Sequence, residues 1–150
     1  MNDRTSSAQD TAPYAALLLR VSLGIMFIAH AGLKYYVFTL PGTAKFFESI
    51  GLPGPLAYLT FAAELIGGVL ILTGVGTRWA ALALVPILLG ATWAHAGNGW
   101  VFNAPNGGWE YPAFLTIAAL VQVLLGDGAY SLVKLFGARN QSNTHTALTA

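Results

Sequence analysis

Apolar residues in this sequence gather into four long runs, with polar connections between them. The runs cover residues 14–36, 55–75, 77–97 and 111–126. A helix rises about 1.5 Å per residue, so about 20 apolar residues cross the roughly 30 Å of bilayer hydrocarbon. The fourth run is short unless its helix continues through Tyr130 and Leu132. The pattern predicts an all-α fold, an integral membrane four-helix bundle.

The connections predict how these helices follow one another. Gly74-Val75-Gly76-Thr77 leaves room only for a tight antiparallel hairpin between the second and third helices. Loops of about 18 residues after the first run and about a dozen after the third should lie on one side of the membrane. Pro55 and Pro112 suit first-turn positions, and Pro86 predicts a kink in the third helix.

Basic residues are unevenly divided between the two sides of this bundle. The side that holds both termini carries Arg4, Arg78, Lys134 and Arg139, with Arg20 about one turn deep. The other side carries Lys34 and Lys45. Because cytoplasmic segments are enriched in Lys and Arg, both termini are expected in the cytoplasm.

The chain accordingly divides into a cytoplasmic N-terminal segment (1–13), a membrane domain (14–136) and a flexible cytoplasmic tail (137–150). Ala29-His30-Ala31 follows an apolar run and resembles a signal-peptidase site. Arg20 lies inside that run and acidic residues precede it, which argues against cleavage.

Composition narrows the possible functions. Of the 150 residues 55% are hydrophobic, 9% are charged and none is cysteine, and the mean hydropathy is +0.61. A soluble domain carries about 25% charged residues, so this chain lacks the charge to cover a water-exposed surface. Absence of cysteine excludes disulfide scaffolds, thiolate metal sites and thiol redox relays. A net charge of +1 provides no basic field for nucleic acid.

The tetrapeptide Ala-His-Ala-Gly occurs twice, at residues 29–32 and 94–97. Each copy ends an odd-numbered run, which should place His30 and His95 at similar depth near the outer face. The repetition indicates a weak two-hairpin tandem repeat, and parallel repeats bind ligands where their halves meet. Coincidence is the alternative, since Ala and Gly are common in this chain.

Ionisable residues inside the apolar runs are the most informative ones, because the bilayer penalises them unless they have partners. At about 100° per residue, Arg20, His30 and Lys34 share one face of the first helix. Glu64 lies near the middle of the second run, and His30 is its nearest partner by depth, with Lys34 reaching in from above. In the alternative interpretation Arg20 and Lys34 extend to opposite interfaces, and Glu64 only fixes the helix register. Small residues near Glu64 should allow close helix packing; they are Ala63, Gly67 and Gly68.

Aromatic and polar residues gather around the outer end of the third run. The candidates for ligand contact there are Trp93, His95, Trp100 and Glu110. Tryptophans at an interface also form the ordinary aromatic belt. Two histidines at one depth beside aromatic planes suit a flat ligand such as a quinone, with which His and Glu could exchange protons. A haem or metal held by His30 and His95 is a weaker alternative, because neither helix carries further ligands at suitable spacing.

The order of short motifs resembles the DoxX family of small bacterial membrane proteins over residues 17–132. The motifs include Leu19-Arg20-Val21-Ser22-Leu23-Gly24, Ala63-Glu64-Leu65-Ile66-Gly67-Gly68, Gly76-Thr77-Arg78-Trp79-Ala80 and Gly126-Asp127-Gly128-Ala129-Tyr130-Ser131-Leu132. After the first run this chain has His30-Ala31 where the family commonly has His-Gly. The resemblance implies a four-span inner-membrane protein, in a family whose name derives from a subunit linked to thiosulfate:quinone oxidoreduction.

The leading hypothesis is a quinone-linked redox or accessory subunit with a polar pocket that opens outward. In it, His30, Glu64 and Lys34 are catalytic groups, and Arg20 joins Trp93, His95, Trp100 and Glu110 in binding the ligand. A non-catalytic assembly subunit and an oligomeric small-solute transporter are the alternatives. Expected partners are lipid, the quinone, and a second membrane subunit or another copy of this chain.

Overall fold

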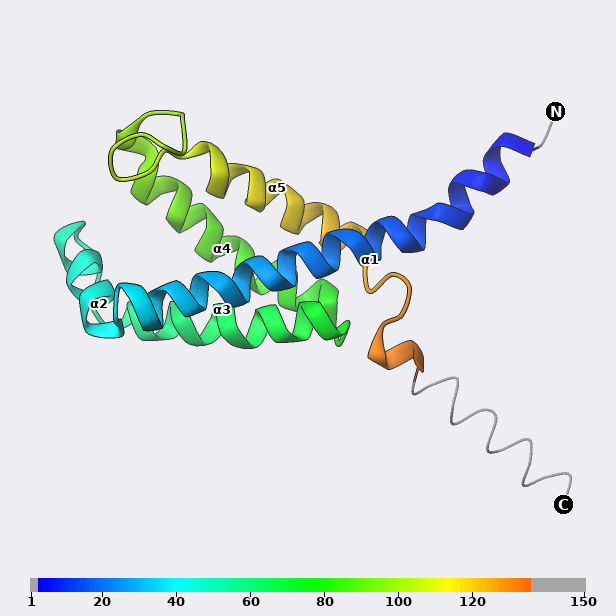
Figure 1. Ribbon diagram of the computed structural model, residues 1–150, viewed down its shortest axis with the longest axis horizontal. Helices are drawn as coiled ribbons and strands as arrows, with labels where there is room; N and C mark the ends of the chain where they lie inside the picture. The colour runs from blue at the N-terminus through cyan, green and yellow to red at the C-terminus, as the bar shows by residue number, and fades with distance from the viewer. Residues whose placement is uncertain (1–2, 136–150) are drawn as a thin grey trace, which may run out of the picture.

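The computed structural model describes residues 3–135, with side chains from residue 11 onward. Four long helices form a bundle (Figure 1): α1 (Asp3–Gly32), α3 (Leu56–Thr73), α4 (Thr77–His95) and α5 (Glu110–Leu125). The shorter helices include the π-helical turn η1 (Leu33–Val37), α2 (Leu40–Ser49) and the 3-10 turn η2 (Ala96–Asn98), and residues 132–135 are also helical. The described part contains no strand, and the expected all-α membrane bundle is confirmed.

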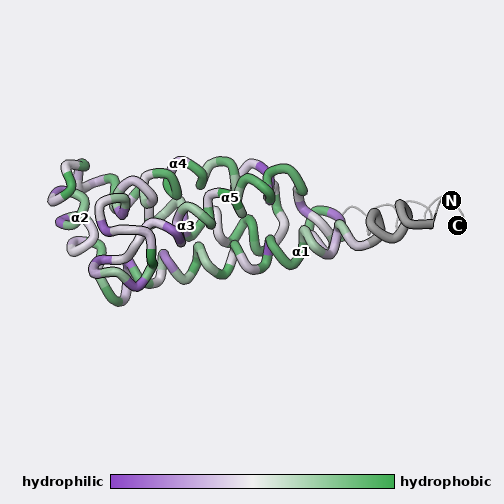
Figure 2. Tube along the Cα trace, turned by 90° about the horizontal axis from the view of Figure 1, so that it is seen from above, coloured by the Kyte–Doolittle hydropathy of each residue, from purple (hydrophilic) through white to green (hydrophobic). Residues whose placement is uncertain are grey.

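Within the described residues three helical segments are long and apolar enough to cross a membrane, at Thr11–Val37, Leu56–Thr73 and Thr77–Asn98. Figure 2 shows hydrophobic positions along the middle of the bundle and hydrophilic positions gathered at the end that holds α2. Helix α5 is apolar but has 16 residues, or about 24 Å of helix. The helix does not continue through Tyr130 and Leu132 and is therefore the short one of the two alternatives, because it ends before Gly126, whose φ of 75° leaves the helical region.

The connection between α3 and α4 is the predicted tight hairpin. Gly74 and Gly76 both adopt left-handed conformations, with φ of 75° and 59°. The other two connections lie together at the opposite end of the bundle, as expected (Figure 1). We name this the loop end, and the end with the α3–α4 turn the terminus end.

The first loop contains a helix, α2, which the sequence analysis had not predicted. Thr39 begins this helix with φ of 60°, and its Oγ1 accepts the amide of Gly42 at 3.2 Å. Such a cap satisfies an amide that has no partner within the helix.

Each long helix packs against two others, in the cyclic order α1, α3, α4, α5. The most extensive contacts join α1 to α3 and α4 to α5. These pairs are the two hairpins that a tandem repeat would contain, and α1 and α4 occupy diagonal positions.

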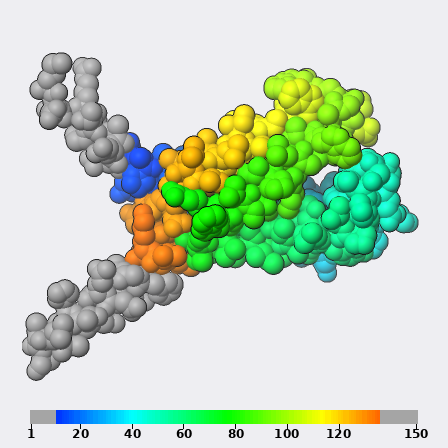
Figure 3. Space-filling model, turned by 180° about the vertical axis from the view of Figure 1, so that it is seen from behind, coloured from blue at the N-terminus to red at the C-terminus, as the bar shows by residue number. Residues whose placement is uncertain are grey.

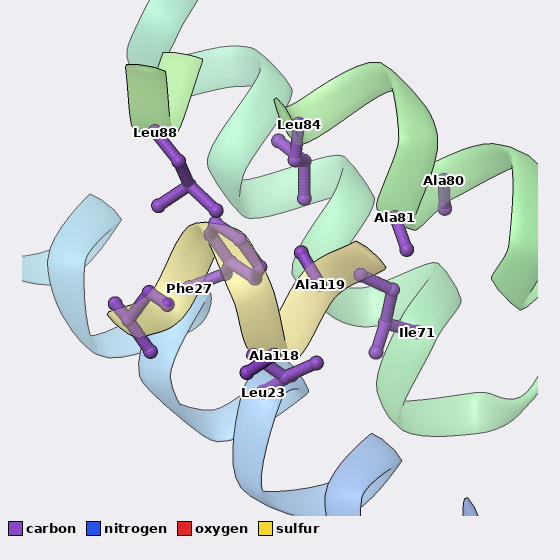
Figure 4. Close-up of a cluster of buried hydrophobic side chains, with 10 residues drawn as sticks. Leu23, Phe27, Ile71, Ala80, Ala81, Leu84, Leu88, Ala118 and Ala119 are labelled. Carbon is purple, nitrogen blue, oxygen red and sulfur yellow. The ribbon is translucent and has the colours of Figure 1, made fainter. Parts of the chain in front are cut away.

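Medium-sized apolar residues and alanines fill the centre of the bundle (Figure 4). Leu23 and Phe27 of α1 meet Leu84 of α4 and Ala119 of α5 there. The alanines allow the helices to approach closely, as in other membrane bundles.

Glycines set the closest approach of α1 and α3. A Cβ atom on Gly24 would lie 2.8 Å from the backbone nitrogen of Leu72, and one on Gly68 would lie 3.1 Å from the carbonyl oxygen of Gly24. A Cβ on Gly67 would lie 2.7 Å from Leu84 of α4. The small-residue surface expected around Glu64 therefore does bring helices together.

Candidate functional site

An ion pair joins α1 to α3 at the loop end. The Nζ atom of Lys34 donates to Oε2 of Glu64 at 2.6 Å, and the two side chains are 16% and 8% exposed. Lys34 belongs to η1, a π-helical turn of a kind that often occurs at functional sites. The structure therefore pairs Glu64 with Lys34, whereas counting depth along the helices had put His30 nearest.

His30 lies one turn before Lys34 and is oriented toward a different helix. Its Nδ1 is 2.7 Å from the carbonyl oxygen of Met26, and its ring stacks on Tyr111 of α5 at 5.7 Å and 20°. Since a carbonyl only accepts, Nδ1 carries the proton, and Nε2 is left as a hydrogen-bond acceptor. The Tyr111 hydroxyl lies 3.7 Å from the Met26 sulfur, which closes a small cluster between α1 and α5.

A shallow apolar cleft of about 210 Å³ runs along α1 and α5 up to this cluster. Met26 and Tyr111 form one part of its lining; the rest is Leu19, Ser22, Leu23, Phe114, Leu115 and Ala118. A hydrophobic chain could lie in it with its polar end near the imidazole of His30.

His95 repeats the local geometry of His30 on the diagonal helix. Its Nδ1 is 2.9 Å from the carbonyl oxygen of Ala91, again at the preceding turn. Its ring packs against the loop that follows, where a Cβ on Gly107 would lie 3.2 Å from Cδ2. Within residues 11–135 no three His, Cys, Asp or Glu side chains gather in a way that could hold a metal ion.

The other residues expected at the mouth of the site hold the loop between α4 and α5. Oε1 of Glu110 accepts the amide of Phe102 at 2.8 Å. Trp100 contacts Trp109 edge to face at 4.5 Å, and Trp93 is exposed. In Figure 3 this loop and α2 stand apart at the loop end of the molecule.

Arg20 lies at the terminus end, about 15 Å along α1 from His30. Its side chain is 2% exposed, and its guanidinium donates to the carbonyl oxygens of Asp127 at 2.6 Å and Tyr130 at 3.2 Å. Tyr130 adopts a φ of 50°, which turns this loop toward Arg20. Arg20 therefore lies away from His30 and Lys34, whose face of α1 the sequence predicted it to share, and the partners of its guanidinium are at the other end of the bundle.

Asp127 is a site residue that sequence reasoning missed. Its Oδ1 accepts the amide of Thr77, the first residue of α4, at 3.0 Å. A Cβ on Gly74 would collide with Arg20 and Ser131, so the hairpin turn packs directly on this cluster. The sequence feature that could have identified Asp127 is the motif Gly126-Asp127-Gly128, which places an acidic residue directly after the last helix in a sequence with few acidic residues.

Three atoms of this terminus-end cluster lack a hydrogen bond within the described part of the chain. They are Nε of Arg20, Oγ1 of Thr77 and Oε1 of Gln122. All three residues are buried, and Gln122 donates its Nε2 to the carbonyl oxygen of Gly126 at 2.7 Å.

Comparison with known proteins places the chain in a family. The DoxX model matches residues 15–97. A Bacillus subtilis (strain 168) protein named "Putative oxidoreductase CatD" is 47% identical over 75 residues, 50% of this chain and 54% of that protein, so this match spans about half of its length. A Haemophilus influenzae protein named "Uncharacterized protein" is 31% identical over 134 residues, 83% of this chain and 92% of that protein. No solved structure matches. The family match covers more than half of the residues, and the chain belongs to the DoxX family.

Proposed function

We propose that this chain is a membrane subunit of a quinone-linked oxidoreductase and binds the quinone between α1 and α5 at the loop end. The observation that carries the proposal is the stacked pair of His30 and Tyr111 beside an apolar cleft. The similar Bacillus subtilis protein carries an oxidoreductase name, which supports the same reaction class.

The cleft suits the isoprenoid tail of a quinone. Its surface from α1 and α5 is apolar, and the cleft is open on one side, which would face the lipid in a membrane. A tail could enter from the bilayer without crossing water, and the flat headgroup would then meet Tyr111 and His30.

His30 could exchange a proton with a quinol or a quinone. Its Nδ1 proton is held by Met26, so Nε2 can accept the proton of a quinol hydroxyl, or return it to a quinone oxygen. Reduction of a quinone takes two electrons and two protons, and His30 would supply or receive one of these protons. Tyr111 would hold the headgroup by stacking.

Lys34 and Glu64 would provide the second protonatable site. Their ion pair is one helical turn above His30 and partly shielded from water. A negative headgroup oxygen would be drawn to the ammonium of Lys34, and Glu64 could then take up the proton that the quinol releases.

The electrons would come from a partner subunit or a bound carrier, because the chain has no cysteine for a thiol relay. On this proposal Trp93, His95, Trp100 and Glu110 form and support the mouth at the loop end. Arg20 is left out, because its guanidinium binds the terminus-end loop. The excess of Lys and Arg at the terminus end supports an inner-membrane orientation with both termini cytoplasmic.

Titration of the purified chain in lipid nanodiscs with a short-tailed quinone, followed by tryptophan fluorescence, tests the proposal. We expect saturable binding that weakens at least about 10-fold in His30→Ala, corresponding to about 1.4 kcal/mol for a lost hydrogen bond and stacking contact. Glu64→Gln should weaken binding less and slow quinol oxidation by the assembled enzyme. Glu48→Gln removes the same charge from exposed α2 and should change neither.

A non-catalytic assembly role is the second candidate, and the buried ion pair favours it, since such pairs also fix how helices meet. It expects His30→Ala and Glu64→Gln to lower thermal stability without altering any ligand signal. Selective loss of quinone binding at full stability supports the redox role, and no saturable binding to the wild-type chain overturns it.

A further inference from the structure

A second hollow lies at the terminus end, far from the proposed quinone site. It encloses about 590 Å³, within the roughly 300–1,000 Å³ typical of ligand sites. The start of α4, the segment after α5 and residues 12–16 of α1 line it, and Figure 3 shows these three parts of the chain side by side. Arg78, Trp79, Asp127 and Lys134 contribute its polar and aromatic lining.

The two basic residues of this hollow have donors to spare. Arg78 gives one bond to the carbonyl oxygen of Leu124 at 3.4 Å, and Lys134 gives one to that of Gly128 at 2.8 Å. An arginine has five N–H donors and a lysine has three. Among residues 11–135 the one ion pair is Lys34–Glu64, so no carboxylate neutralises Arg78 or Lys134 by direct contact.

Asp127, the one acidic residue that lines the hollow, already has hydrogen-bond and electrostatic partners. Asp127 accepts the amide of Thr77 through Oδ1, and the buried guanidinium of Arg20 lies against its backbone. Arg20 also interacts electrostatically with Asp127 from the interior of the bundle, so the hollow has two basic side chains, Arg78 and Lys134, against one acid that already has partners.

The hollow also lies at the level where the membrane surface is expected. The spans begin at Thr11 and Thr77, and α5 ends at Leu125. Trp79 is 73% exposed beside Arg78, and tryptophans in such positions lie among lipid headgroups. Basic pockets between helices at this level suit lipid phosphates.

We infer that the hollow binds the phosphate of an anionic phospholipid, with Arg78 and Lys134 as its ligands and Trp79 against the glycerol region. The site is independent of the quinone proposal, because the two lie at opposite ends of the bundle.

The test uses the full chain in detergent, supplemented with phosphatidylglycerol or phosphatidylcholine, with bound lipid counted by native mass spectrometry and the melting temperature measured in parallel. We expect wild type to retain phosphatidylglycerol preferentially and to melt higher with it. Lys134→Gln and Arg78→Gln should each weaken retention about fivefold, as expected for one basic residue near an anionic lipid.

Matched variants separate the site from general charge effects. Lys45→Gln removes the same charge from α2 at the loop end and should leave retention unchanged, while Arg78→Lys keeps the charge and should retain most binding even if Arg78→Gln unfolds. Equal retention of both lipids by wild type overturns the inference, as does a Lys45→Gln loss equal to that of Lys134→Gln. Inorganic phosphate that raises the melting temperature without any lipid preference would identify a site for free phosphate and overturn the lipid assignment.

Discussion

Asp127 caps a helix that begins 50 residues before it, through a 3.0 Å hydrogen bond from the amide of Thr77 to its carboxylate. Helix α4 has no side-chain cap of its own, because its N-cap residue is Gly76. The loop after the last helix thus completes the start of the third span, and Arg20 fixes that loop by two further bonds.

Replacement of Asp127 by alanine should lower the free energy of unfolding by about 1–3 kcal/mol, since a lost cap costs about 1 kcal/mol and the buried Arg20 also loses its electrostatic attraction to the Asp127 carboxylate. Asp127→Asn keeps an acceptor oxygen for Thr77 and should cost less. Thermal unfolding in detergent measures both. An Asp127→Ala protein as stable as wild type would show that the cap does not stabilise α4.

The pair of Lys34 and Glu64 should behave as a coupled unit. Lys34→Met or Glu64→Leu alone leaves one charge in a low-dielectric site and should cost about 3 kcal/mol. The double variant, which replaces both charges by apolar groups, should be more stable than either single one. A double-mutant cycle from unfolding curves gives the coupling, and strictly additive losses would argue against the pair.

Alanine at Gly24 should destabilise the α1–α3 contact by about 1–3 kcal/mol, because the added methyl group meets the backbone of Leu72 and neither helix can shift freely. Gly90 in α4 is the matched control, since a Cβ there has nothing within 4 Å. Gly90→Ala should stabilise slightly, by up to about 1 kcal/mol, through helix propensity. Melting temperatures that fall equally in both variants would rule out close packing as the cause.

Two buried threonines should respond in opposite ways to valine. Oγ1 of Thr77 has no hydrogen-bond partner in the described residues, so Thr77→Val should leave stability unchanged or raise it. Oγ1 of Thr116 donates to the carbonyl oxygen of Pro112 at 2.8 Å, and Thr116→Val should cost about 1 kcal/mol. Melting curves of the two variants, measured in parallel, test this prediction. A lower melting temperature of Thr77→Val would instead indicate that an ordered water binds the Thr77 hydroxyl.

Much of the bundle could be predicted because long apolar runs identify membrane helices and glycines identify the tight turns between them. The hairpin at Gly74 and Gly76, the shared side of the two longer loops and the close packing at Gly67 and Gly68 all follow from local sequence. Helix α2 was missed because its ten residues are too few for a span and lie within a stretch rich in Pro, Gly and Thr.

The candidate site was harder to predict, because the length of a side chain decides which residue it contacts as much as the depth of its Cα atom in the membrane does. Glu64 pairs with Lys34, whose long side chain extends from a π-helical turn toward the middle of the bundle. In a π-helix the rotation per residue differs from the roughly 100° of an α-helix, which was the value used to place Lys34. His30 meets Tyr111 instead, a contact between helices far apart in sequence. Arg20 shared a helical face with both, but its partners are backbone carbonyls beyond α5, and no side-chain pattern reveals these.

The long-range cap also bears on how the protein is made. A chain that emerges from the ribosome from its N-terminus can form α1, α3 and their glycine contact early, since both helices precede residue 74. Helix α4 is synthesised before its capping carboxylate, and the carbonyl groups that bind Arg20 also come later in the chain. The contacts that residues 127–131 make with Arg20 and Thr77 can therefore form only after α1, α3 and α4 have been synthesised, and they join the first span to the third.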